Sequence, residues 1–376
     1  MPPRQSSPTL SKKRTTVQQS RQDERGWKPA LDRGNPHDII PLFGGRLPSS
    51  AIHSPVVPSR VLRGNPLRDP SDRILPIYLP PGYEQDTRRY PVVYLLSGYT
   101  GNGMSFLNWT PWEDNLQSRM DRLLSEGACK PMILVMPNGF TRYGGSQYIN
   151  STATGPYQDY LLELVAWVDA HYRTIANRDH RAVAGHSSGG FGALTMVMDH
   201  PKMFAMIADH SGDKGFAKCY ARDLLGIPDR LSRVDIAPLL ADPSRVRPKD
   251  DDFFALMEMA AMSACYSPNP ATALGFEWPV DTYTGELNPH VWSRWLSHDP
   301  LERLAEATEA LGSLRLLFLD CGNKDEYSLH LGCRLMSRRM TQLGVPHHYE
   351  EFDAGHRDLK SRYDISLAAI SAAMPQ

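Results

Sequence analysis

The chain has 376 residues, of which 41% are hydrophobic and 22% are charged, and this composition excludes a chain that is disordered throughout. Lysine and arginine number 41 against 42 aspartate and glutamate residues, and the formal charge of −1 excludes a globally basic nucleic-acid-binding protein. The absence of any run of about 18 consecutive apolar residues excludes a membrane-spanning helix.

Residues 1–50 are predicted to form a disordered, basic N-terminal tail. Arginine, lysine, serine, glutamine and proline are frequent there, and too few apolar side chains are present to order the segment. A basic arm of this kind could bind nucleic acid or an acidic partner, but a solvated tail is the preferred interpretation. The remainder, 51–376, is expected to be one catalytic domain.

The five cysteines are expected to be reduced thiols, because their number is odd and no pair has the spacing of metal ligands. They are Cys129, Cys219, Cys265, Cys321 and Cys333. The N-terminus lacks the apolar core of a secretory signal, so a cytoplasmic location is expected. We expect no metal and no organic cofactor.

From about residue 72, short apolar runs alternate with amphipathic stretches, a pattern typical of an α/β sheet. The segment 73–79 is expected to be an edge strand, because Pro76 cannot donate to a central ladder. Strands buried on both faces are predicted at 92–96, 132–136, 181–184, 204–208 and 314–319. A last, alternating strand is predicted at 348–352, and helices are predicted at 156–172, from Ser188 to about 200, and at 357–373.

About a hundred residues between His210 and Leu314 contain no strong strand pattern. Within them, the three aspartates 250–252 precede a predicted helix at 253–264, where acidic side chains favour a helix start. We therefore expect a helical insertion at about 214–312 that forms a lid over the ends of the strands.

The sequence Gly185-His186-Ser187-Ser188-Gly189 fits the pattern G-x-S-x-G between a predicted strand and a predicted helix. In this context the serine lies on a strained turn that lifts its hydroxyl clear of the sheet, and the glycines allow the chains to pass closely. Ser187 is the only serine in the required register. It is the predicted nucleophile.

A serine hydroxyl needs a base that is held in place by an acid. His356 follows the last predicted strand and is the predicted base; His347 and His348 are poorer candidates. The acid is expected after the preceding strand, where Asp325 is the preferred residue and Glu326 the second choice. Asp213, after an earlier strand, is a third candidate.

The oxyanion of an acyl-transfer reaction needs two backbone N–H donors. One is predicted from Ser188, directly after the nucleophile. The other is predicted from Tyr99, in the glycine-rich loop 97–101 that follows the strand at 92–96.

With these residues in view, the chain resembles the putative esterase (esterase D-like) family of the α/β-hydrolase superfamily. The resemblance extends over about 60–372 and rests on Leu79-Pro80-Pro81-Gly82-Tyr83, on the segments 90–98 and 180–190, and on Phe352-Asp353-Ala354-Gly355-His356. It implies an α/β-hydrolase fold with a mostly parallel central sheet flanked by helices. The family's serine, acid and histidine match Ser187, Asp325 and His356. One departure is Ser97-Gly98, where the family usually has His-Gly.

The resulting hypothesis is a serine carboxylic ester hydrolase that acts on a small-molecule ester through an acyl-enzyme. Trp109, Trp112 and Trp292 are the candidate substrate-binding residues, because aromatic side chains near the mouth of a site can bind an aryl or acyl group. Two alternatives stay open, an acyltransferase with the same triad and a catalytically silent binding protein on this scaffold. The acyl and alcohol groups of the substrate and the oligomeric state are not predicted.

Overall fold

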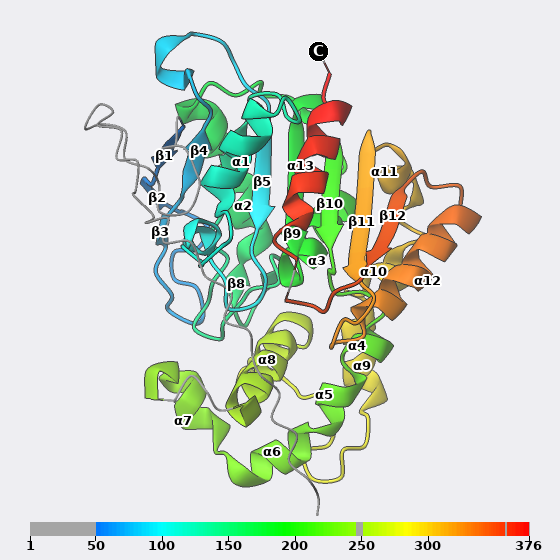
Figure 1. Cartoon of the computed structure of the whole chain (residues 1–376). Helices are drawn as coiled ribbons and strands as arrows, with labels where there is room; N and C mark the ends of the chain where they lie inside the picture. Colours follow the sequence, from blue (N-terminus) through cyan, green and yellow to red (C-terminus); the bar gives the residue numbers. More distant parts are fainter. Residues whose placement is uncertain (1–49, 246–250, 358, 376) are drawn as a thin grey trace, which may run out of the picture. The chain divides into compact units, whose positions relative to one another are not determined.

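The computed structural model describes residues 50–245, 251–357 and 359–375. An eight-stranded sheet runs through this part of the chain in the spatial order β1-β4-β6-β5-β9-β10-β11-β12 (Figure 1). Its strands are β1 (Ala51–His53), β4 (Ile77–Leu79), β5 (Val92–Leu96), β6 (Ile133–Val135), β9 (Arg181–His186), β10 (Met206–His210), β11 (Leu316–Gly322) and β12 (His348–Phe352). β4 pairs antiparallel with both neighbours, and the pairs from β6 to β12 are parallel. This mostly parallel sheet confirms the expected fold class.

Alternate residues of β5 point to opposite faces of the sheet and enter two separate hydrophobic clusters. Val92, Tyr94 and Leu96 pack with side chains of α2 (Tyr157–His171), α3 (Ser188–Asp199) and α12 (Leu329–Gln342). Val93 and Leu95 pack with side chains of α1 (Leu116–Ser125) and α13 (Arg362–Ala373). A continuous apolar run is therefore required, because both faces of the strand are covered by helices.

The prediction of an edge strand at 73–79 is wrong. The segment divides at Leu75 and Pro76 into β3 (Asp72–Ile74), which pairs with β2 (Val56–Pro58) in a separate two-stranded sheet, and β4. β4 lies inside the large sheet, since β1 covers its outer side. The proline is tolerated because it falls between two strands and not within a ladder.

Between β10 and β11 the described residues form helices and no strand longer than an isolated bridge. They are α4 (Phe216–Cys219), α5 (Ala221–Leu225), α6 (Ile227–Arg233), α7 (Ile236–Ala241), α8 (Asp251–Tyr266), α9 (Pro289–Leu296), α10 (Pro300–Arg303) and α11 (Thr308–Gly312). We call the segment 216–296 the insertion. Figure 1 shows its helices beyond the carboxyl ends of the parallel strands, where an α/β sheet binds its ligands.

The remaining elements are a hairpin of β7 (Asn150–Ser151) and β8 (Gly155–Pro156) and four 3₁₀ turns, η1 (Tyr83–Gln85), η2 (Gly103–Leu107), η3 (Arg178–His180) and η4 (Pro243–Arg245). The final helix begins at Arg362, five residues later than predicted. The predicted N-terminal tail lies outside the described residues, except for its last residue, Ser50.

Candidate active site

Ser187 lies at the turn between β9 and α3, with φ 58° and ψ −125°, a backbone conformation that costs energy for any residue with a Cβ. The flanking glycines make the turn possible. A Cβ at Gly185 would lie 2.4 Å from the carbonyl of Gly189, and a Cβ at Gly189 would lie 2.1 Å from the carbonyl oxygen of Leu96. The strained serine is therefore held between two strand ends and the start of a twelve-residue helix.

His356 lies in the loop between β12 and α13, beside the end of β11. Its Nδ1–H donates to Oδ2 of Asp325 at 2.7 Å, and both side chains are almost completely buried. This hydrogen bond fixes the tautomer in which Nε2 is free to accept a proton. Ser187 Oγ is not hydrogen-bonded to the imidazole, and in hydrolases without substrate this contact is commonly long.

The Asp325 carboxylate is held by the start of α12. Oδ1 accepts the backbone N–H groups of Tyr327 at 2.9 Å and Leu329 at 3.3 Å, and Oδ2 lies 3.8 Å from Cys321 Sγ. These two backbone donors hold the carboxylate in place, with its Oδ2 against Nδ1 of His356.

The two other candidate acids occupy different positions. Glu326 accepts the backbone N–H of His356 at 2.6 Å, a bond that lowers the pKa of Glu326 and holds the loop rather than the imidazole. Asp213 accepts hydrogen bonds at 2.8 Å from Gln147 and from the hydroxyl of Tyr220, and burial raises its pKa. Neither carboxylate is hydrogen-bonded to the His356 ring.

The two predicted oxyanion donors come from different segments of the chain. The Ser188 N–H is the first of α3, and the Tyr99 N–H belongs to the loop that follows β5. In the described part of the chain, neither N–H has a hydrogen-bond acceptor. A Cβ at Gly98 would lie 3.3 Å from Ser187 Cβ, so this loop passes directly beside the serine. One N–H without an acceptor thus follows Ser187 directly in the chain, and the other belongs to the residue after Gly98, which lies beside Ser187.

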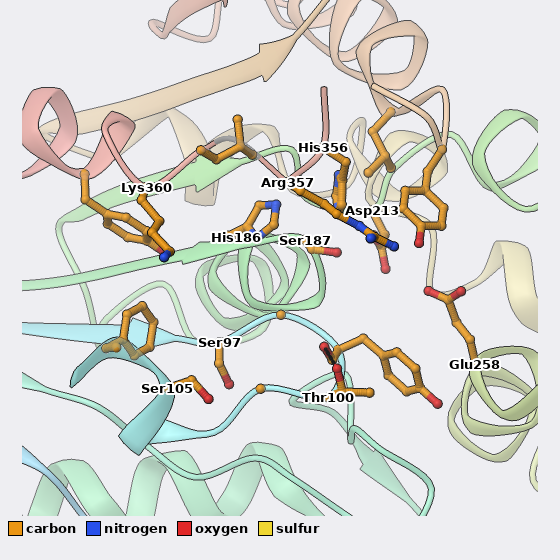
Figure 2. Close-up of a pocket in the computed structure, with 18 of the residues that line it drawn as sticks. Ser97, Thr100, Ser105, His186, Ser187, Asp213, Glu258, His356, Arg357 and Lys360 are labelled. Carbon is orange, nitrogen blue, oxygen red and sulfur yellow. Dashed lines mark hydrogen bonds between the residues drawn. The ribbon is translucent and has the colours of Figure 1, made fainter. Parts of the chain in front are cut away.

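A cavity of about 540 Å³ contains Ser187, His356 and the Tyr99 loop. Figure 2 shows Ser187 and His356 near its middle, with Ser105 and Lys360 to one side and Asp213 and Glu258 to the other. A volume of this size suits a small organic molecule.

The three predicted substrate-binding tryptophans are not among the residues that line this cavity. Trp109 is 67% exposed and Trp112 is 91% exposed. Trp292 packs against the core of the insertion, with its ring centroid 5.8 Å from that of Trp295. The aromatic rings that do line the cavity are Tyr99, Phe106, Tyr220, Phe254, Tyr327 and Tyr363.

A second set of serine, histidine and aspartate was not predicted. Ser366 Oγ lies 2.9 Å from His210 Nε2, and His210 Nδ1 lies 2.7 Å from Asp320 Oδ1. Arg362 donates to the other oxygen of Asp320 at 2.7 Å. All four side chains are buried, and His210 also accepts the backbone N–H of Ser187 at its carbonyl oxygen, at 2.9 Å. These residues join α13 to β10 and β11 behind the nucleophile.

Within residues 50–245, 251–357 and 359–375, no group of three or more histidine, cysteine, aspartate or glutamate side chains could hold a metal ion. All five cysteines are buried and unpaired by disulfides, as expected. No helix in these ranges has the length and apolar character needed to cross a bilayer.

The chain is similar in sequence to known proteins. Residues 70–374 match the protein family described as "Putative esterase". The chain is 37% identical over 139 residues to Esterase Rv1288 of Mycobacterium tuberculosis, and 32% identical over 133 residues to an endo-1,4-beta-xylanase/feruloyl esterase of Xylanibacter ruminicola. These matches cover 36% and 34% of this chain but only 28% and 18% of the two relatives.

Solved structures show the same fold over most of the chain. A ferulic acid esterase superposes with a TM-score of 0.56 at 22% identity, covering 86% of this chain and 98% of the esterase. An S-formylglutathione hydrolase from Staphylococcus aureus superposes with a TM-score of 0.53 at 17% identity, covering 87% of this chain and 99% of that enzyme. At these identities the likeness concerns the fold alone.

Proposed function

This chain belongs to the putative esterase family, and we propose that it is a serine carboxylic ester hydrolase that works through an acyl-enzyme intermediate. The observation that carries the proposal is one cavity lined by Ser187, His356 and Tyr99, with Asp325 hydrogen-bonded to His356 behind it. In the described chain, the N–H groups of Tyr99 and Ser188 have no acceptor. These are the parts that acyl transfer to a serine requires.

In the proposed reaction, Ser187 Oγ attacks the carbonyl carbon of the ester while its proton passes to Nε2 of His356. The N–H groups of Tyr99 and Ser188 donate to the oxyanion. His356 then gives the proton to the departing alcohol oxygen. His356 then takes a proton from water, which attacks the acyl-enzyme and forms a second tetrahedral intermediate. This intermediate collapses, the acid leaves, and His356 returns the proton to the Ser187 oxygen.

The insertion would act as a lid in this scheme. The insertion contributes to the cavity wall through Tyr220, Asp223, Phe254, Glu258 and Met259. A wall built from the insertion can limit the access of water and select the substrate.

A fluorophosphonate probe and a simple ester test the proposal together. We expect p-nitrophenyl acetate to be hydrolysed with an initial burst, and the probe to add one phosphonyl group, which peptide mapping places on Ser187. A folded protein with no adduct and no turnover contradicts the proposal and favours a silent binding protein. Exclusive transfer of the acyl group to an added alcohol, with no free acid, favours an acyltransferase.

A further inference from the structure

One part of the cavity contains carboxyl groups that no catalytic step uses. We call it the acidic lobe and define it by Asp213, Asp223 and Glu258, which all line the cavity. Asp223 is only 5% exposed, yet its carboxyl group has no hydrogen-bond or ion-pair partner in the described part of the chain. The Glu258 carboxyl likewise has none, and Figure 2 shows it directed into the cavity.

The nearby cations compensate these carboxyl groups incompletely. Arg357 lines the lobe but is exposed, and Arg230 on α6 is shared with Asp252, whose Oδ1 lies 3.7 Å from Arg230 Nε. Burial raises the pKa of Asp223, and the charge of Arg222 on α5 opposes that rise. Burial likewise raises the pKa of Asp213, and the charges of His356 and Lys214 oppose it. Burial first, and then the charges of Asp213 and Asp223, raise the pKa of Glu258 to about 8. The lobe therefore holds carboxyl groups that repel one another when ionised.

The other side of the cavity differs, because its charged groups are paired. Lys360 Nζ lies 2.6 Å from Glu113, and Arg119 forms an ion pair with Asp364. Carboxyl groups without an ion-pair partner are thus found in the acidic lobe and not among these residues.

Aromatic rings form the walls of this lobe. Tyr99 and Phe254 meet edge to face at 5.6 Å between centroids, and the Tyr327 ring lies 4.8 Å from that of His356. Tyr99, Tyr327 and Glu258 all line the cavity, and burial and then the charge of Glu258 raise the pKa values of both tyrosines. Aromatic faces combined with carboxylates are the surroundings that stabilise an organic ammonium group.

We propose that the acidic lobe binds an ammonium group carried by the ester substrate. This inference rests on the proposed function and adds the substrate class. An uncharged hydroxyl group could hydrogen-bond to one carboxyl group, but unlike a cation it would not favour the ionised form of Glu258 beside Asp213 and Asp223. In the described chain these carboxylates do not form a set that could hold one metal ion, which favours a bulky organic cation over an inorganic one.

Matched esters test the proposal on either side of the scissile bond. For the alcohol part, acetylcholine is compared with its uncharged carbon isostere, 3,3-dimethylbutyl acetate. For the acyl part, the p-nitrophenyl ester of 4-(trimethylammonio)butyrate is compared with that of 5,5-dimethylhexanoate. We expect kcat/KM to favour the cationic ester by about tenfold or more in one arm, which identifies the part that occupies the lobe. Equal values in both arms overturn the proposal.

Variants that remove a carboxylate test whether a preference for the cationic ester arises in the acidic lobe. Asp223→Asn and Glu258→Gln should each reduce the cationic-to-neutral ratio of kcat/KM to about threefold or less. Asp229→Asn is the matched control, because Asp229 is an exposed carboxylate on α6 that does not line the cavity, and it should retain the wild-type ratio. A preference that survives in both lobe variants overturns the assignment.

A binding measurement separates the failure of this inference from failure of the proposed function. Calorimetry with phenyltrimethylammonium requires no turnover and should detect binding to wild type that weakens in Asp223→Asn. Hydrolysis of p-nitrophenyl acetate without cation preference or binding refutes the subsite alone. Binding of the cation without hydrolysis of any ester refutes the esterase alone and supports the subsite.

Discussion

The described part of the chain contains two sets of serine, histidine and aspartate, which share the histidine–aspartate bond but differ at the serine and in their surroundings. Ser366 is hydrogen-bonded to His210 at 2.9 Å, whereas Ser187 is not hydrogen-bonded to His356. The His356–Asp325 and His210–Asp320 bonds are both 2.7 Å long. Ser187 lies on a strained turn beside a cavity, whereas Ser366 lies within α13 and is fully buried. Under the proposed function, the comparison means that a hydrogen-bonded set is not enough for catalysis, which also requires access for the substrate and donors for the oxyanion.

The largest effect should separate the two serines. Ser187→Ala is expected to reduce kcat/KM for p-nitrophenyl acetate by about 10⁴-fold or more, because the proposed reaction forms the acyl-enzyme on the Ser187 oxygen. Ser366→Ala should change it by less than about threefold and reduce stability by roughly 1 kcal/mol, the value of one hydrogen bond. Rates and urea denaturation of both variants check this. A large rate loss in a folded Ser366→Ala protein would contradict our distinction.

Substitution of Asp325 should mainly reduce activity, whereas substitution of Asp320 should mainly reduce stability. Asp325→Asn is expected to lower kcat by about 10³- to 10⁴-fold with little change in the thermal midpoint, since the imidazole loses its orienting charge. Asp320→Asn leaves Arg362 and His210 incompletely paired and should reduce stability by about 3–5 kcal/mol. Calorimetric unfolding and steady-state kinetics distinguish these outcomes. Glu326→Gln serves as a control for the second-choice acid, and a loss in it as large as that in Asp325→Asn would reverse the assignment.

The raised pKa of Glu258 in the acidic lobe should make the stability of the folded protein depend on pH. The unfolded chain releases the Glu258 proton near pH 4.3, whereas the folded chain retains it to about pH 8. Between these values the folded state binds more protons, so this group lowers the free energy of unfolding as the pH rises. The stability of Glu258→Gln relative to wild type should therefore increase from pH 5 to pH 8 in urea titrations. A constant difference over this range would show that Glu258 has an ordinary pKa in the folded protein.

The smallest effects are expected at the exposed tryptophans. Trp109→Ala and Trp112→Ala should change kcat/KM for p-nitrophenyl acetate by less than about threefold, because neither side chain lines the cavity. A tenfold rise in KM in either variant would restore the sequence-based prediction that these residues bind substrate.

The sequence by itself was sufficient to predict the parallel strands of the sheet, the turn at Ser187 and the residues of the proposed triad. These features depend on local patterns. Apolar runs mark strands such as β5 that are covered on both faces, and the glycines beside Ser187 are required by contacts as short as 2.1 Å. The order of serine, acid and histidine along the chain follows from the order of the strands.

Only the tertiary structure decided which side chains meet across the sheet and at the ends of its strands. Pro76 suggested an edge strand, but the pairing of β1 with β4 depends on a segment that is distant in sequence. Trp292 had the right chemistry for a pocket, yet its helix turns it against the insertion core. Asp223 and Glu258 lie on separate helices, so no spacing in the sequence relates them. Their shared cavity arises from the packing of the insertion, and long-range packing leaves no local pattern in the sequence.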